Sequence, residues 1–207
     1  MSDDRAQILR SIREALHPIP AERLTAYPEW DTSLTRMAIN PDLGSPWDVF
    51  AFRLRQVNGT PVDDLAELAN WMRTEKLVFG YCDPFLAERL RNTGNFDGIE
   101  FETEFSVAKV DEYQFGITRA AGAIAETGTV VLKDKITSAR LAALAPWTHI
   151  ALLHPEDLVE YVDVAVTQLG DDPSVIWATG PSKTADVEGI LIEGVHGPGV
   201  QVVCLDR

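Results

Sequence analysis

The sequence predicts an α/β protein, with a three-layer αβα body around a mainly parallel sheet and a helical N-terminal arm ahead of it. Two observations support this prediction. Short apolar runs rich in Val, Ile and Leu recur between residues 76 and 205, and helical patterns separate several of them. Strands buried on both faces of a parallel sheet have such continuous runs. The 207 residues and the hydrophobic content of 45 % are enough for one sizeable core.

The chain opens with a predicted amphipathic helix, "DDRAQILRSIREAL", and "HPIP" ends it because proline cannot continue a helix. Its apolar face consists of Ile8, Leu9, Ile12 and Leu16. Residues 18–47 contain five prolines and predict an irregular arm over the body. The apolar face needs a groove on its own chain or on a neighbour, so a homo-oligomer stays open.

Four further helices are expected. "PWDVFAFRLRQVNG" predicts one that Asn58-Gly59 ends, and Thr60-Pro61 is expected to cap and start the next. "PFLAERLRN" has Pro84 in its first turn, and "PEDLVEYVDVAVTQLG" is amphipathic. The predicted strands are residues 76–80, 106–110, 129–132, 149–153, 174–178 and 200–205. We therefore expect a helical region at residues 1–59 and an α/β domain at residues 60–207.

Charge argues against a nucleic-acid partner. The formal net charge is −14, from 32 acidic and 18 basic residues, whereas a surface for the phosphate backbone needs clustered Lys and Arg. The first thirty residues have no signal-peptide core, and no apolar run approaches the ~18 residues needed to span a bilayer. We expect a cytoplasmic protein with no membrane span.

The metal-ligating residue types do not form a site by their spacing. Cys82 and Cys204 are far apart, and an all-cysteine zinc or iron–sulfur site takes four thiolates. The histidines have neither an HExxH nor a paired spacing. No metal site is predicted on this chain.

The first candidate site lies in "AGAIAETGTVVL", where Glu126 precedes Thr127, Gly128 and Thr129 at the start of an apolar run. A buried glutamate must be hydrogen-bonded, paired or protonated, because its desolvation costs several kcal/mol. Glu126 either braces a turn by accepting backbone N–H groups or acts as a nucleophile or proton carrier. Both readings stay open.

Three other polar clusters fall near expected strand ends, where open parallel sheets bind ligands. His149 opens a run in "APWTHI" and would bond a carbonyl or act in catalysis. "GPSKTADVE" offers Gly180, Ser182, Lys183 and Thr184 as an anion cradle or as helix-capping residues. "GVHGPG" holds His196 at the apex of a tight bend. The expectation is that these loops converge with Glu126 around one hollow.

The segments "FGITRAAGAIAETGTVVL", "PWTHI" and "GPSKTADVEGILIEGVHGPGV" together resemble the LUD domain, and within it the lactate-utilization protein C family. The resemblance covers residues 115–203. It implies the NagB/RpiA/CoA-transferase-like fold, a parallel sheet between helices. At position 183 this sequence has a lysine where the family often has an arginine. The planar guanidinium group is thereby replaced by an ammonium group, which acts as a point charge.

The resemblance also implies a role as the cluster-free component of a cytosolic system that oxidises L-lactate to pyruvate with iron–sulfur partner proteins. Its pocket would hold a small carboxylate or a cofactor-like ligand, or dock a partner, with Glu126, His149 and His196 as the reactive groups. The residues that would bind a cofactor are Thr127, Gly128, Thr129, Gly180, Ser182, Lys183 and Thr184. The cofactor of this chain stays unknown. Resemblance to related CoA transferases implies an alternative, an acyl-transfer enzyme with Glu126 as nucleophile. A non-catalytic assembly or regulatory module is the third reading.

Overall fold

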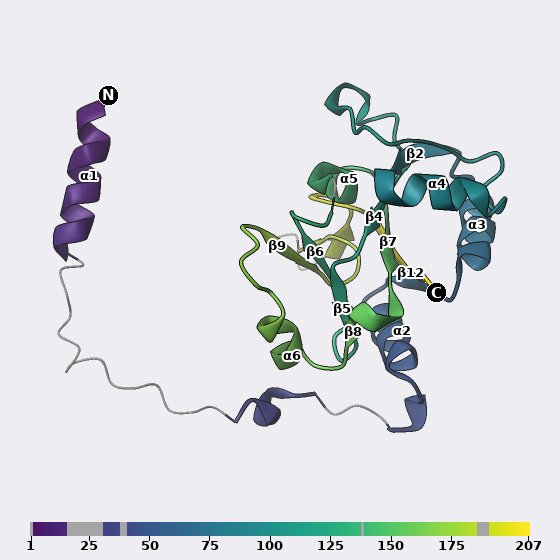
Figure 1. Cartoon of the computed structure of the whole chain (residues 1–207), viewed down its shortest axis with the longest axis horizontal. Coiled ribbons are helices and arrows are strands. Elements are labelled where there is room, and N and C mark those ends of the chain that lie inside the picture. The colour runs from purple at the N-terminus through teal and green to yellow at the C-terminus, as the bar shows by residue number, and fades with distance from the viewer. Residues whose placement is uncertain (1, 16–30, 38–40, 138, 186–190) are drawn as a thin grey trace. The chain divides into compact units, whose positions relative to one another are not determined.

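The structure, a computed structural model, describes residues 2–15, 31–37, 41–137, 139–185 and 191–207. The chain forms two compact units, Met1–Leu34 and Thr35–Arg207. The first contains the predicted N-terminal helix as α1 (Ser2–Ala15) (Figure 1). Ile8 and Ile12 of this helix are exposed. Much of the predicted arm lies outside the described residues. Its described parts include short 3-10 helices at Thr32–Thr35 and Pro41–Leu43. The predicted domain boundary after residue 59 stays a prediction.

The second unit is built on a six-stranded, fully parallel sheet in the order β1-β12-β7-β4-β2-β3. Its strands are β1 (Thr60–Val62), β2 (Phe79–Cys82), β3 (Glu100–Glu102), β4 (Phe115–Arg119), β7 (Thr148–Leu153) and β12 (Val200–Leu205). All six residues of β7 are buried, as expected for a strand covered on both faces. This sheet confirms the predicted α/β class.

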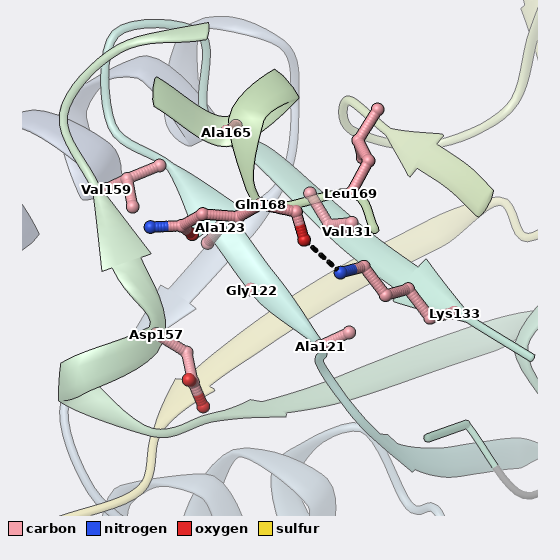
Figure 2. Close-up of a pocket in the computed structure, with 10 residues that line it drawn as sticks. All are labelled: Ala121, Gly122, Ala123, Val131, Lys133, Asp157, Val159, Ala165, Gln168 and Leu169. Atoms are coloured by element: carbon pink, nitrogen blue, oxygen red, sulfur yellow. Dashed lines mark hydrogen bonds between the residues drawn. The ribbon is translucent and has the colours of Figure 1, made fainter. Parts of the chain in front are cut away.

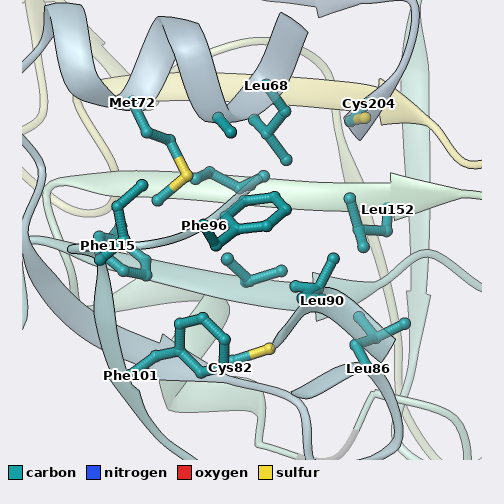
Figure 3. Close-up of a cluster of buried hydrophobic side chains, with 14 of the residues drawn as sticks. Leu68, Met72, Cys82, Leu86, Leu90, Phe96, Phe101, Phe115, Leu152 and Cys204 are labelled. Atoms are coloured by element: carbon teal, nitrogen blue, oxygen red, sulfur yellow. The ribbon is translucent and has the colours of Figure 1, made fainter. Parts of the chain in front are cut away.

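One face of this sheet is covered by α3 (Leu65–Thr74) and α4 (Pro84–Asn92) (Figure 1). Their apolar residues at helical spacing meet side chains from alternate positions of the strands. Figure 3 shows this core, with Leu68, Met72 and Leu90 of the helices near Phe115 and Leu152 of the sheet.

The other face is covered by α2 (Pro46–Gln56), by α5 (Arg140–Leu144) and by a second, four-stranded sheet. The second sheet has the order β8-β5-β6-β9, with β8 (Leu158–Val159), β5 (Gly122–Ile124), β6 (Thr129–Lys133) and β9 (Val175–Ala178). α6 (Val162–Thr167) packs on it through Ala165. The predicted strands at 129–132 and 174–178 therefore form, but they pair antiparallel with each other outside the central sheet.

Two local predictions were wrong. Residues 106–110 form a 3-10 turn at Val107–Lys109, and Val107 is 66 % exposed, so this run has no sheet to bury it. Thr60 and Pro61 lie in β1 and do not cap a helix. β1 pairs only with β12 in the described sheet, and such an edge strand tolerates a proline without an N–H. α3 instead starts after Asp64, whose carboxylate accepts a hydrogen bond from Glu67 N at 2.8 Å.

The amphipathic helix predicted at residues 155–170 is much shorter than expected. A 3-10 turn at Pro155–Asp157 and strand β8 replace its first half, and α6 begins only at Val162. Pairing of β8 with β5 explains the change, because that pairing satisfies backbone groups in an extended conformation. A separate hairpin, β10 (Lys183–Ala185) and β11 (Leu191–Glu193), completes the described strands.

Candidate functional site

Glu126 lies in the turn between β5 and β6 and is 2 % exposed. Its Oε1 accepts a hydrogen bond from Val162 N at 2.6 Å, and its Oε2 accepts one from Met37 N at 2.8 Å. Two backbone N–H groups from distant segments thus compensate the burial of this side chain. In this arrangement Glu126 holds two segments against the β5–β6 turn.

The hydroxyl groups beside Glu126 bond to one another. Thr127 Oγ1 lies 2.7 Å from Thr129 Oγ1, which in turn lies 2.8 Å from Thr179 Oγ1. Gly128 has a φ of +66°, and a Cβ there would lie 2.5 Å from Leu54 N of α2. Only glycine combines this backbone conformation with this close approach. Gly128 therefore sets the distance between the turn and α2.

His149, on β7, is 1 % exposed and has a partner on each ring nitrogen. Gln201 Nε2 lies 3.1 Å from Nδ1, and Thr118 Oγ1 lies 2.8 Å from Nε2. An amide nitrogen only donates, so Nδ1 accepts and Nε2 carries the proton directed at Thr118. Burial lowers the pKa of His149 to about 4. The imidazole is therefore neutral near pH 7.

The predicted anion cradle at residues 180–184 is used within the chain. Lys183 Nζ donates to Val57 O at 2.9 Å and lies 3.7 Å from Glu193 Oε1. Ser182 N donates to Pro198 O, and Gly194 N donates to Ser182 O, both at 2.9 Å. These bonds bring Ser182 next to the 194–199 loop, where His196 is exposed.

The convergence of the predicted residues around one hollow stays a prediction. Within the described ranges, no hydrogen bond or ion pair joins Glu126 to His149 or His196. The position of Gly180, with a φ of +74°, is fixed against Val57 at the end of α2. Thr184 lies in β10. The contacts divide the predicted residues into three neighbourhoods: the β5–β6 turn, the core around β7, and the 180–199 region.

The carboxyl ends of β2 and β4 hold two residues that sequence reasoning missed. β2 leads through α4 to β3 on one side, while β4 leads to β7 and β12 on the other, so the crevice of an open sheet falls between them. Asp83 follows β2 and is 0 % exposed, and Arg119 ends β4. The Asp83-Pro84 pair after an apolar run was the available signal, because Asp and Pro are typical of N-cap and N1.

Asp83 and Arg119 form an ion pair in this crevice. Arg119 Nε donates to Asp83 Oδ2 at 3.0 Å, and Phe85 N donates to Oδ1 at 2.9 Å. Arg119 Nη2 donates to Ile136 O at 2.5 Å. The guanidinium carbon lies 4.2 Å from the ring centroid of Phe85, which is 74 % exposed. The exposed ring of Phe85 therefore packs on the ion pair of Arg119 and Asp83 at the strand ends.

Two partly enclosed hollows of the described residues are small. Figure 2 shows one beside the second sheet, with a volume of about 20 Å³, which is room for one water molecule. Lys133 Nζ donates to Gln168 O across it at 2.6 Å (Figure 2). A second hollow, of about 100 Å³, is lined by Gly44, Pro46, Val49, Ala125, Glu160 and Tyr161.

Larger spaces near the strand ends are open to solvent. A groove of about 510 Å³ runs along α4 from Phe85, and one of about 670 Å³ contains Thr137, whose hydroxyl donates to Arg119 O. Exposed Val107 and Leu141 also line the second groove. These surfaces are shallow and partly apolar.

No group of three or more His, Cys, Asp or Glu residues that could hold a metal occurs in the described part of the chain. Cys82 and Cys204 are buried free thiols. Burial raises the pKa of Cys82 to about 12, and it also raises the pKa of Cys204. Among the described helices, none has the length and apolarity needed to cross a bilayer.

A parallel central sheet with covered faces and an ion pair at its strand ends defines an α/β protein of the open-sheet type. The family model of the LUD domain matches residues 83–205. The chain belongs to the LUD domain family. The matched residues include the crevice, the Glu126 turn and β12.

Curated relatives are lactate utilization protein C of several bacteria. The protein of Oceanobacillus iheyensis is 41 % identical over 91 residues, which are 40 % of this chain and 39 % of that protein. That of Deinococcus radiodurans is 32 % identical over 51 % of this chain and 52 % of its own length. That of Bacillus subtilis is 35 % identical over 46 % and 43 %. The matches thus span about half the length of these relatives or less.

The crystal structure of a DUF162 family protein from Deinococcus radiodurans is similar in fold. Its TM-score is 0.52 at 20 % identity, over 79 % of this chain and 99 % of that one. This likeness supports the α/β fold. The finer NagB/RpiA/CoA-transferase-like assignment stays a prediction.

Proposed function

We propose that this chain is the cluster-free component of a cytosolic iron–sulfur system for L-lactate utilization. Two observations support the proposal: the relatives that carry the name lactate utilization protein C, and the presence of only two cysteines, Cys82 and Cys204, both buried and far apart in sequence. An all-cysteine iron–sulfur cluster needs four thiolates. The clusters would therefore lie on partner proteins.

Within this role, we favour docking of a partner over capture of lactate in a closed pocket. The sizes of the hollows are the observation that carries this choice. Small-molecule sites bury most of the ligand surface, whereas the two partly enclosed hollows described above measure about 20 and about 100 Å³. One open groove is lined by the exposed Phe85 and by Arg89. A second open groove is lined by Val107 and Leu141, together with Thr137, whose hydroxyl donates to Arg119 O. We define this docking face by Phe85, Arg89, Val107 and Leu141.

The acyl-transferase alternative receives less support from the geometry. A nucleophilic carboxylate must reach its substrate, but Glu126 is 2 % exposed and both of its oxygens accept backbone N–H groups. Both ring nitrogens of His149 are likewise occupied. A direct part of either residue in proton or acyl transfer would require these bonds to break.

Reconstitution tests the proposal. The chain and the cluster-bearing lactate-utilization proteins of its source organism are purified separately and assayed for L-lactate-dependent dye reduction, alone and combined. We expect dye reduction only in the combined sample. Full activity of this chain alone, or full activity of the partners without it, would contradict the proposal. D-lactate serves as the substrate control.

A further inference from the structure

The segment that precedes α2 reaches the Glu126 turn through its residues 35–37. Met37 N donates to Glu126 Oε2 at 2.8 Å. Next to it, Arg36 donates to both carboxylate oxygens of Asp163, through Nε at 3.2 Å and Nη2 at 2.9 Å. The Arg36 guanidinium carbon also lies 4.4 Å from the ring centroid of Tyr161. One short segment thus contacts Glu126, Tyr161 at the N-cap of α6 and Asp163 in the first turn of α6.

The acceptor surface beneath this segment is acidic. Glu126 and Asp163 contribute their carboxylates, and Glu160 lines the hollow of about 100 Å³ together with Tyr161 and Ala125, the neighbour of Glu126. Charge complementarity therefore explains why an arginine of the segment lies here.

The segment itself lies at the surface. The side chain of Arg36 is 37 % exposed and Met37 is 47 % exposed, whereas Glu126 below them is 2 % exposed. Exposed ion pairs contribute little to stability, because water solvates both partners when they separate. A buried carboxylate is thus covered by a segment whose described side-chain anchors are solvent-accessible.

We propose that residues 35–37 form a releasable strap over Glu126, anchored by Arg36 on Asp163 and Tyr161. Release of the strap frees Glu126 Oε2 and exposes this carboxylate beside the hollow of about 100 Å³, while the core of the protein stays folded. The strap controls access to the one acid that the sequence places at this turn.

Chemical labelling of carboxylates in the full chain tests the strap. Each protein is treated with a water-soluble carbodiimide and glycine ethyl ester at one fixed pH, digested with trypsin and analysed by mass spectrometry. The peptide from Ala120 to Lys133 contains Glu126 as its single acidic residue. Asp83, with 0 % exposure in the core unit, is the internal reference for global unfolding.

Arg36→Ala and Asp163→Asn each remove one side of the anchor. We expect Arg36→Ala to raise labelling of Glu126 about fivefold, because the partly exposed ion pair and the cation–π contact are both lost. Asp163→Asn removes the ion pair alone and should raise labelling about twofold to threefold. Neither change should alter labelling at Asp83. Arg55→Ala removes an exposed arginine from α2 and is the matched control, expected to leave both sites unchanged. Unchanged labelling of Glu126 in both anchor variants, or a parallel rise at Asp83, would overturn the strap.

Discussion

At the scale of single residues, buried polar side chains connect parts of the chain that are far apart in sequence. Glu126 bonds backbone groups 89 and 36 residues away, and His149 bonds Thr118 and Gln201 on the two neighbouring strands. Each bond compensates desolvation that would otherwise destabilise the fold. The sequence identified both residues as special, but their partners could not be predicted because the partners depend on the register of strands and loops.

The buried imidazole predicts a pH dependence of stability. The pKa of His149 is about 4 in the folded state and near 6.5 when unfolded, so the unfolded state binds more protons between these values. Stability is therefore highest above about pH 6.5 and falls with acidification, by about 3 kcal/mol near pH 4. Urea unfolding of the wild type at a series of pH values measures this loss.

Two variants separate the contribution of His149 to the pH dependence of the unfolding free energy from the contribution of the carboxylates. His149→Asn retains hydrogen-bonding atoms and cannot titrate in this range, so its unfolding free energy should depend less on pH. His154→Asn changes an exposed histidine and should retain the wild-type slope. Equal slopes in the wild type and His149→Asn would contradict the assignment.

At the scale of elements, close packing of the β5–β6 turn on α2 joins the second sheet to the helical cover of the first. Gly128 lies at the closest approach, where a Cβ would be 2.5 Å from Leu54 N. Its positive φ follows from the turn between β5 and β6. The contact brings α2 into the same apolar cluster as both sheets.

Gly128→Ala should lower the free energy of unfolding by about 2–4 kcal/mol, because it adds backbone strain and a clash with α2. Gly170→Ala is a matched control: Gly170 has a φ of +65°, but no atom lies within 4 Å of the added Cβ. It should cost only the backbone strain, about 1 kcal/mol. Equal losses in the two variants, measured by urea unfolding, would show that the close approach to α2 is unimportant.

Elements with strong local signals were predictable, and short ones were not. α1, α2 and α4 have helical periodicity with proline or a positive-φ residue near their ends, and they lie where the sequence predicts them. β1, β3 and β8 have three residues or fewer. Their conformation is decided by distant partner strands, which local patterns do not contain.

At the scale of the whole molecule, two open grooves lie near the strand ends of the parallel sheet. The ring of Phe85 lies there and packs on Arg119, which is paired with Asp83. Exposed apolar side chains such as Phe85, Val107 and Leu141 suit a protein partner more than a small anion. The fold class and the family could be predicted from motifs. The proposed docking face could not be predicted from the sequence, because it combines residues from separate segments that come together only through the order of the strands.

The affinity of the full chain for the proposed cluster-bearing partners tests the proposed docking face most directly. Phe85→Ser should weaken binding at least about tenfold, measured by titration calorimetry, with little change in the free energy of unfolding. Phe52→Ser is the matched control, since Phe52 is 41 % exposed on α2 and also lies near an arginine, Arg53; it should leave the affinity unchanged. Wild-type affinity in Phe85→Ser, or equal weakening in both variants, would contradict the account.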